Sequence, residues 1–232
     1  MLAQFIKNDK IFDMRQKSRL GILGGAFNPP HFGHLKIAKK AVKELGLKKL
    51  LLMVAGRPPL KSEDIAPIKD RLAMAKIFAS FDPRFKVSTI EIKRAKEGRK
   101  SYTIDTLKEL KRKYPNKEIY WIIGEDSLRE ILQGKWEGGT SVLNEAKFVV
   151  FNRPGYRIKS KIKNPPRRQA GQKSKTQIKI KEIKLKLKIP ISSTEIRKKI
   201  KGGEDVSKMA PPKILDYIKK KKLYSYHSNF NS

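Results

Sequence analysis

Two histidines carry the clearest chemical signal in the sequence. His31 and His34 stand three residues apart, shortly after the glycine pair Gly24-Gly25. Glycines in such a turn let backbone N–H groups approach an anion, and a helix that begins there adds the positive end of its dipole. Two imidazoles at this place can donate hydrogen bonds to phosphate oxygens and stabilise charge that develops when phosphorus is attacked. The turn therefore predicts a phosphate-binding site.

Two other interpretations of this turn stay open. The histidines could be incidental in a glycine-rich turn, although only one other histidine, His227, occurs in the chain. A metal site would need further ligands, and the chain has no cysteine to supply them. We rank the metal site below the phosphate site and assign no protein ligand to a metal.

The elements that must position this turn alternate between strands and helices. Continuous apolar runs of this kind are typical of strands buried on both faces of a parallel sheet, and they are separated by segments of helical spacing. We expect strands at Arg19–Leu23, Leu50–Val54, Phe85–Ile92, Ile119–Ile123 and Phe148–Phe151, and helices around 35–45, 72–78 and 103–112. This order predicts an α/β, Rossmann-like, doubly wound parallel sheet. Ligands of such sheets bind beyond the carboxyl ends of the strands.

The C-terminal third differs in composition. Between Phe151 and Lys188 there are 14 Lys and Arg residues and one acid, so we expect a basic loop insertion at 156–182. Apolar residues at 183–189 alternate with lysines, which predicts a strand with one wet face at the sheet edge. Ser192 and Glu195 have the spacing of a helix capping box, and a last helix is expected to begin near Pro211.

Composition excludes several classes of protein. The 232 residues carry a formal net charge of +33 and include no cysteine, so disulfide scaffolds and thiol catalysis are excluded. No apolar run approaches the roughly 20 residues of a membrane span, and the first residues lack a secretory signal. We expect one cytoplasmic domain at 19–225, with an N-terminal extension at 1–18, a tail at 226–232 and anionic partners. A chain-wide lysine bias explains the charge at least as well as nucleic-acid binding, and no specific nucleic acid is expected.

Several segments, taken in order, resemble one enzyme family. They run from Leu20 to Tyr224 and read GGAFNPPHFGH (24–34), RPPLK (57–61), SYTIDTL (101–107), GEDS (124–127), RPGY (153–156), ISSTEIR (191–197), YI (217–218) and LY (223–224). The first resembles the signature of nucleotidylyltransferases with a His-x-Gly-His turn. Together, the segments resemble the bacterial nicotinate-nucleotide adenylyltransferases.

This resemblance implies a reaction and a set of site residues. The phosphate of nicotinate mononucleotide would attack the α-phosphorus of ATP and release pyrophosphate, with Mg²⁺ held mainly by the phosphates. His34 would lie against the α-phosphate, His31 nearer the rest of the triphosphate, and Arg197 would clamp the β- and γ-phosphates. The implied ATP-binding residues are Gly24, Gly25, Ala26, Phe27, His31, His34, Gly124, Asp126, Ser192, Ser193, Thr194 and Arg197, and the implied acceptor-binding residues are Asn28, Lys61, Tyr102, Thr103 and Trp136.

Several of these residues also have structural interpretations. Asp126 could cap the helix after its strand, Trp136 could belong to the core, Tyr102 could be a packing residue, and Arg197 could be an ordinary surface arginine. The chain also departs from the family pattern at Ala26, Asn28 and Leu60, where Thr or Ser, Asp and His are usual. The family usually begins a few residues before the first strand, so Met14 is an alternative start.

Alternative functions stay open from the sequence. Within the same class, the acceptor could be nicotinamide mononucleotide or another phosphomonoester such as phosphopantetheine. In a different class, the chain could be a basic RNA-binding protein on the same scaffold, although it has two tryptophans and no aromatic-rich basic motif. The sequence leaves the choice between monomer and homo-oligomer open.

Overall fold

The computed structural model describes residues 18–59, 65–152, 181–184 and 191–224. Several predictions fall outside these ranges: the N-terminal extension before Ser18, the choice of Met14 as start, the site residue Lys61, the tail at 226–232 and most of the basic insertion. Residues 181–182, which we expected at the end of that insertion, belong instead to a strand, and so does Ser18, which we expected in the N-terminal extension.

Six parallel strands form one sheet. They are β1 (Ser18–Gly25), β2 (Lys49–Val54), β3 (Phe85–Ser88), β4 (Lys117–Gly124), β5 (Lys147–Asn152) and β6 (Lys181–Lys184), in the spatial order β3-β2-β1-β4-β5-β6. The chain runs outward from β1 in one direction and then crosses back to β4 on its other side. β1 and β4 are therefore neighbours at the switch point of the sheet, where ligands of this fold bind.

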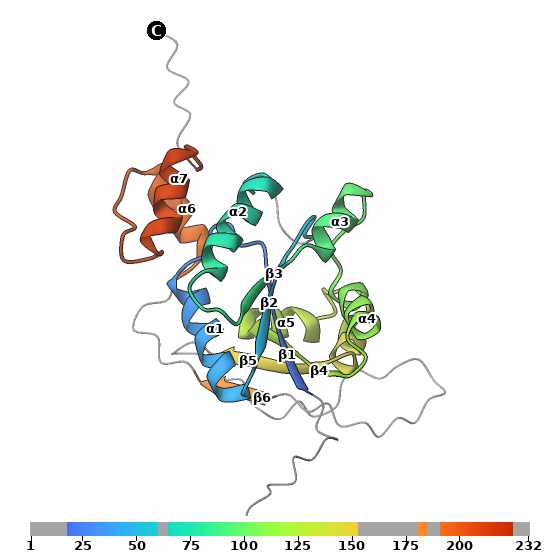
Figure 1. Cartoon of the computed structure of the whole chain (residues 1–232). Helices are drawn as coiled ribbons and strands as arrows, with labels where there is room; N and C mark the ends of the chain where they lie inside the picture. Colours follow the sequence, from blue (N-terminus) through green and yellow to red (C-terminus); the bar gives the residue numbers. More distant parts are fainter. Residues whose placement is uncertain (1–17, 60–64, 153–180, 185–190, 225–232) are drawn as a thin grey trace, which may run out of the picture.

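Helices cover both faces of this sheet (Figure 1). Their bounds are α1 Phe32–Leu45, α2 Ile68–Ala79, α3 Ile90–Lys96, α4 Thr103–Lys113, α5 Glu125–Leu132, the 3-10 helix η1 Gly139–Asn144, α6 Ser193–Lys201 and α7 Pro212–Lys220. Residues alternate between the faces along each strand. Leu23 and Leu52 pack in a core with α1, α2 and α7, whereas Ile22 and Leu51 pack in a second core with α4, α5 and η1. The doubly wound Rossmann-like sheet is thus confirmed.

One predicted strand ends earlier than expected. The run Phe85–Ile92 is strand only to Ser88, and α3 begins at Ile90. The last residue of β3 pairs with Met53, and β2 ends one residue later at Val54, so the neighbouring strand cannot pair with a strand that continues to Ile92. The edge position of the lysine-rich strand is confirmed, but its described part is the short segment β6, and residues 185–190 lie outside the described ranges.

A buried arginine on α2 connects the β1–α1 turn with both ends of the β2–α2 connection. Arg71 is 1% exposed, and its guanidinium donates to the backbone carbonyls of Ala26, Ala55, Gly56 and Ala66. Burial lowers the pKa of Arg71. We did not predict this role, although Arg71 shares the buried helical face of Met74, Ala75 and Phe78, where a charged residue is unusual.

Replacing Arg71 should destabilise the fold. In Arg71→Met, four carbonyls lose their donor in a buried place, so we expect the free energy of unfolding to fall by about 3 kcal/mol or more. Urea denaturation would measure this loss, with Lys76→Met on the exposed side of the same helix as the control. An equal, small loss in both variants would contradict the structural role of Arg71.

Candidate functional site

The turn between β1 and α1 brings the two histidines together. Residues 26–31 are all buried, and the rings of His31 and His34 have centroids 3.8 Å apart. We expected both histidines within the first helical turn. Instead, His31 is the N-cap of α1 with an extended backbone, and its Nδ1 accepts a long hydrogen bond of 3.4 Å from the backbone N–H of His34. A neutral ring that accepts at Nδ1 carries its proton on Nε2, so His31 can donate from Nε2.

Gly33 is required for this arrangement of the histidines. A Cβ at this position would lie 2.8 Å from two ring atoms of His31. Such a contact is shorter than van der Waals packing allows, and the ring would have to move. The middle glycine of the His-x-Gly-His segment therefore permits the His31 ring to fold back over the start of α1.

Arg197 reaches the same turn from the other end of the chain. Its Nη1 donates to the backbone carbonyl of Asn28 at 2.9 Å, and Ser193 Oγ donates to the carbonyl of Pro29 at 2.9 Å. The Nε of Arg197 is buried and has no hydrogen-bond partner among the described residues. Arg197 is therefore not an ordinary surface arginine, and it retains a donor that an anion at this turn could satisfy.

The local fold of α6 explains how Arg197 arrives there. Ser192 Oγ accepts from the backbone N–H of Glu195 at 3.1 Å, so the predicted N-cap is confirmed. Ile196 on the first turn of α6 is fully buried in a small core with Ile191 and Ala210. Arg197 follows directly after this anchor, and the N-terminal end of α6 lies against the β1–α1 turn.

Asn28 is tied to two further segments. It is 3% exposed, and its Oδ1 accepts from the backbone N–H of Ala66 and from the hydroxyl of Tyr224 at 2.8 Å. Burial raises the pKa of the Tyr224 hydroxyl, which keeps it a donor. The contact of Asn28 with the acceptor substrate stays a prediction, because the described contacts of the Asn28 Oδ1 are with other residues of the protein. Tyr224 belongs to a segment of the resemblance, but we had predicted no role for it.

The carboxyl end of β4 lies beside this turn, because β4 pairs with β1. Gly124 is the N-cap of α5, so the interpretation that Asp126 caps this helix is wrong. Asp126 is exposed in the first turn of α5. A Cβ at Gly124 would meet no atom within 4 Å, which means that open space lies in front of this residue. The space in front of Gly24 is smaller, since a Cβ at this residue would lie 3.1 Å from the ring of Trp121.

The segment 101–103 is held against the end of β2. Ser101 Oγ accepts from the backbone N–H groups of Gly56 and Arg57 at 3.0 and 3.1 Å. Tyr102 is the half-buried N-cap of α4, which begins at Thr103. We did not predict the role of Ser101, which fixes Tyr102 and Thr103 beyond the strands' carboxyl ends.

Trp136 packs at the edge of the core, as one of its two interpretations predicted. Its half-buried ring packs against the second core, and its Nε1 donates to Glu130 Oε2 at 3.0 Å. The structure thus gives Trp136 a packing role, and its contact with substrate stays a prediction. Within the described ranges, no group of three histidines, aspartates or glutamates could hold a metal ion.

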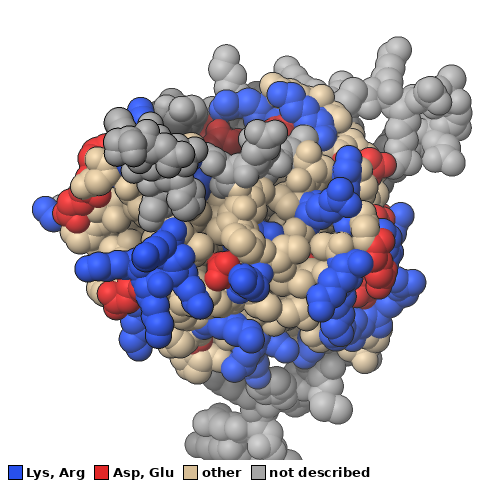
Figure 2. Space-filling view, turned by 90° about the horizontal axis from the view of Figure 1, so that it is seen from above, with Lys and Arg blue, Asp and Glu red and all other residues tan. Residues whose placement is uncertain are grey.

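Basic side chains are spread over one face of the molecule rather than gathered at its middle (Figure 2). Figure 2 shows the upper side of Figure 1, where Lys and Arg side chains are spread around the face and uncharged residues occupy much of its middle.

In the part of the chain that the structure describes, no helix is long and apolar enough to cross a membrane.

Comparisons with known proteins agree with this geometry. Residues 22–199 match the family model described as "Cytidylyltransferase-like". A Clostridium tetani protein named "Probable nicotinate-nucleotide adenylyltransferase" is 39% identical over 204 residues, which cover 88% of this chain and 97% of that protein. A protein of the same name from Clostridium acetobutylicum is 40% identical with the same coverage.

A solved structure shares the fold. The nicotinic acid mononucleotide adenylyltransferase of Plasmodium falciparum, complexed with NaAD, has a TM-score of 0.70 and 22% identity, covering 89% of this chain and 97% of that chain. At this identity the match speaks for the fold alone. The family-model match and the identity to the two clostridial proteins are stronger evidence. They show that the chain belongs to the cytidylyltransferase-like family and, within it, to the nicotinate-nucleotide adenylyltransferases.

Proposed function

We propose that the chain transfers the adenylyl group of ATP to nicotinate mononucleotide, forming nicotinate adenine dinucleotide and pyrophosphate, a step of NAD biosynthesis. The observation that carries this proposal is the hydrogen bond from Arg197 to the Asn28 carbonyl, which brings an arginine to the histidine turn from 169 residues away. A planar guanidinium and two imidazoles at one helix start suit a polyphosphate. The named relatives support the choice of reaction.

The histidines would act on the triphosphate. In the in-line transfer, a phosphate oxygen of the mononucleotide attacks the α-phosphorus of ATP as the bond to pyrophosphate breaks. The protein needs to supply position and positive charge rather than covalent chemistry. His34, in the first turn of α1, would donate to the α-phosphate, and His31 would donate from Nε2 to the remaining phosphates.

Arg197 and the start of α6 would hold the β- and γ-phosphates. The unmet Nε of Arg197 supports this role. The hydroxyls of Ser192 and Ser193 are used internally, on Glu195 and Pro29, so these residues would contribute through the backbone N–H groups of the helix start, together with Thr194.

The nucleoside parts would occupy the switch point and its flanks. Adenosine would lie between the turn 24–27 and the open space in front of Gly124, with Asp126 near the ribose. The acceptor's pyridine ring would lie near Tyr102, Thr103 and Trp136, with the helix start at Thr103 favouring its carboxylate. Lys61, outside the described ranges, and the buried Asn28 complete the proposed acceptor set.

Mg²⁺ would enter with the nucleotide. This ion prefers oxygen ligands, whereas the turn offers imidazole and guanidinium groups, so the turn does not fit a resident magnesium ion. We therefore treat Mg²⁺ as part of the Mg·ATP substrate and derive no step through it. The cytoplasmic location and the oligomeric state stay predictions from the sequence.

Removing the His34 imidazole should slow turnover strongly and spare the fold. In His34→Ala we expect kcat to fall by about 10²-fold to 10³-fold, because a donor to the transition state is lost. Pyrophosphate release would report the rate, and circular dichroism would report folding. Lys36→Ala, exposed on the same helix, is the control. An unchanged kcat in a folded His34→Ala protein would refute the assigned role.

Arg197→Lys should weaken the use of ATP while keeping the positive charge. An ammonium group cannot reproduce the planar fork that joins the Asn28 carbonyl and a phosphate. We expect kcat/KM for ATP to fall by about 10-fold to 100-fold, the loss of one or two hydrogen bonds to a charged group. The exposed Lys198→Met on the same helix should keep the parent value. Equal kcat/KM for all three proteins would contradict the clamp.

The choice of acceptor separates the proposal from its alternatives. Nicotinate mononucleotide, nicotinamide mononucleotide and phosphopantetheine would each be incubated with Mg·ATP, and pyrophosphate release would be compared with a reaction lacking acceptor. We expect the acid mononucleotide to give the highest kcat/KM, because a helix start favours its carboxylate. No turnover of the acid form, with turnover of another acceptor, would overturn the substrate assignment.

A further inference from the structure

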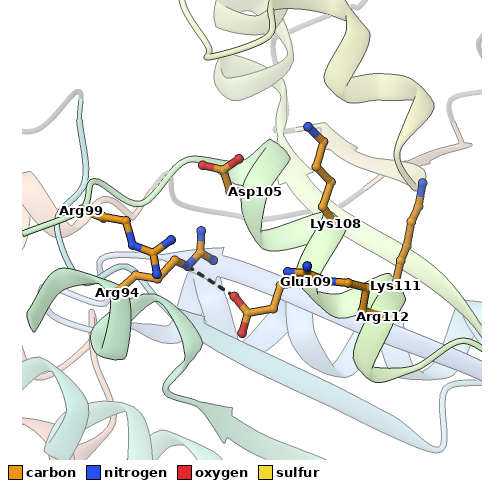
Figure 3. A pocket seen from close by; sticks show the side chains of 7 residues that line it. All are labelled: Arg94, Arg99, Asp105, Lys108, Glu109, Lys111 and Arg112. Atoms are coloured by element: carbon orange, nitrogen blue, oxygen red, sulfur yellow. Dashed lines mark ion pairs between the residues drawn. The ribbon is translucent and has the colours of Figure 1, made fainter. Parts of the chain in front are cut away.

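A surface cavity lies on helices α3 and α4 and the loop between them, and α4 also begins at Thr103 of the proposed acceptor set. Its volume is about 370 Å³. Seven residues line it, as Figure 3 shows: Arg94, Arg99, Asp105, Lys108, Glu109, Lys111 and Arg112. None of these seven residues has a place in the proposed transfer reaction. The cavity therefore needs its own explanation.

Cationic side chains outnumber carboxylates in this cavity. The lining has five cationic groups and two carboxylates, which gives a net formal charge of +3. Arg99 pairs with Glu97 and Lys111 with Glu145, but Arg99 and Glu97 are mostly exposed, and such pairs contribute little. Within the described ranges, neither Lys108 nor Arg112 has an ion-pair partner. Two flexible cations are thus available to a ligand.

Arg94 distinguishes this cavity from an ordinary basic surface. It is 4% exposed, and its Nη2 donates to Thr106 Oγ1 at 2.6 Å, which fixes the guanidinium in place. The buried Nε and Nη1 atoms have no hydrogen-bond partner among the described residues. Leaving such donors unmet costs about 1 to 3 kcal/mol each. A buried, fixed and unsatisfied arginine in a cationic cavity points to an anionic ligand.

One carboxylate of the lining competes for Arg94, whereas the buried Glu91 is linked to it through Thr106. Glu109 Oε2 lies 3.5 Å from Arg94 Nε, as the dashed line in Figure 3 marks, which is an ion pair without a hydrogen bond. Glu109 is 37% exposed and can turn toward water. An anion with more than one charge can replace it, since phosphate oxygens match guanidinium donors in pairs.

We propose that the α3–α4 cavity is a second anion site, which binds a small phosphate-type dianion through Arg94, with Arg99, Lys108 and Arg112 closing around it. The inference does not depend on the proposed reaction, because its residues and its test are separate. A dianion suits the site better than a monoanion, because it must displace Glu109 and offset a net charge of +3.

The test is a titration of the full chain with inorganic phosphate, followed by ¹⁵N NMR. We expect saturable shifts of the Arg94 Nε–H signal and of the backbone amides of residues 108–112 on α4, which lie beyond the helix start at Thr103. The double variant Arg99→Gln/Arg112→Gln, which changes exposed side chains, should weaken the affinity at these signals by about tenfold or more. Arg84→Gln, an exposed arginine after α2, should bind like the parent.

Two outcomes would overturn the proposal. One is a shift that does not saturate or that sodium chloride of equal ionic strength reproduces, which would mean an adventitious ion only. The other is an affinity that the double variant leaves unchanged. Signals of the β1–α1 turn report the proposed ATP site, and those of residues 102–104 report the proposed acceptor site, so binding at either place is counted separately from binding at residues 108–112.

Discussion

The turn between β1 and α1 has buried backbone carbonyls that need hydrogen-bond donors from elsewhere in the chain. Arg71 donates to Ala26, Arg197 donates to Asn28, and Ser193 donates to Pro29. The donors come from α2 and α6, so satisfying the turn fixes both helices around it. Tyr224, after α7, adds a bond to the Asn28 side chain. A requirement for buried hydrogen bonds thus assembles the site from distant segments.

The same requirement gives Arg197 two functions that depend on each other. Nη1 is used by the protein, and Nε is left without a partner in the described residues. The bond from Nη1 holds the guanidinium plane, so the unmet donor has a defined position before any ligand arrives. A preorganised donor loses less conformational entropy on binding than a free surface arginine does. The site is therefore prepared by the same contact that stabilises the turn.

Local patterns made the sheet and the histidine turn predictable. Apolar runs located five of the six strands, and the spacing of His31 and His34 located the turn, because both signals lie within a few residues. The end of β3 was missed, since it depends on where the neighbouring strand stops. Arg71 and Tyr224 were missed because their partners lie far away in the sequence. The place of Arg71 on a buried helical face was the one signal that could have identified it.

The basic residues behind the net charge of +33 differ in their burial, and burial decides what each of them can do. Lysines and arginines that extend into water are solvated, and they act mainly on solubility and weak association. Among the described residues, two arginines instead have buried nitrogens without hydrogen-bond partners, namely Arg94 and Arg197. In each arginine another nitrogen of the guanidinium donates a hydrogen bond that fixes the group, to Thr106 for Arg94 and to Asn28 for Arg197. Because unmet buried donors are costly whereas solvated ones are not, burial distinguishes these two arginines from the chain-wide basic surface as candidates for binding anions.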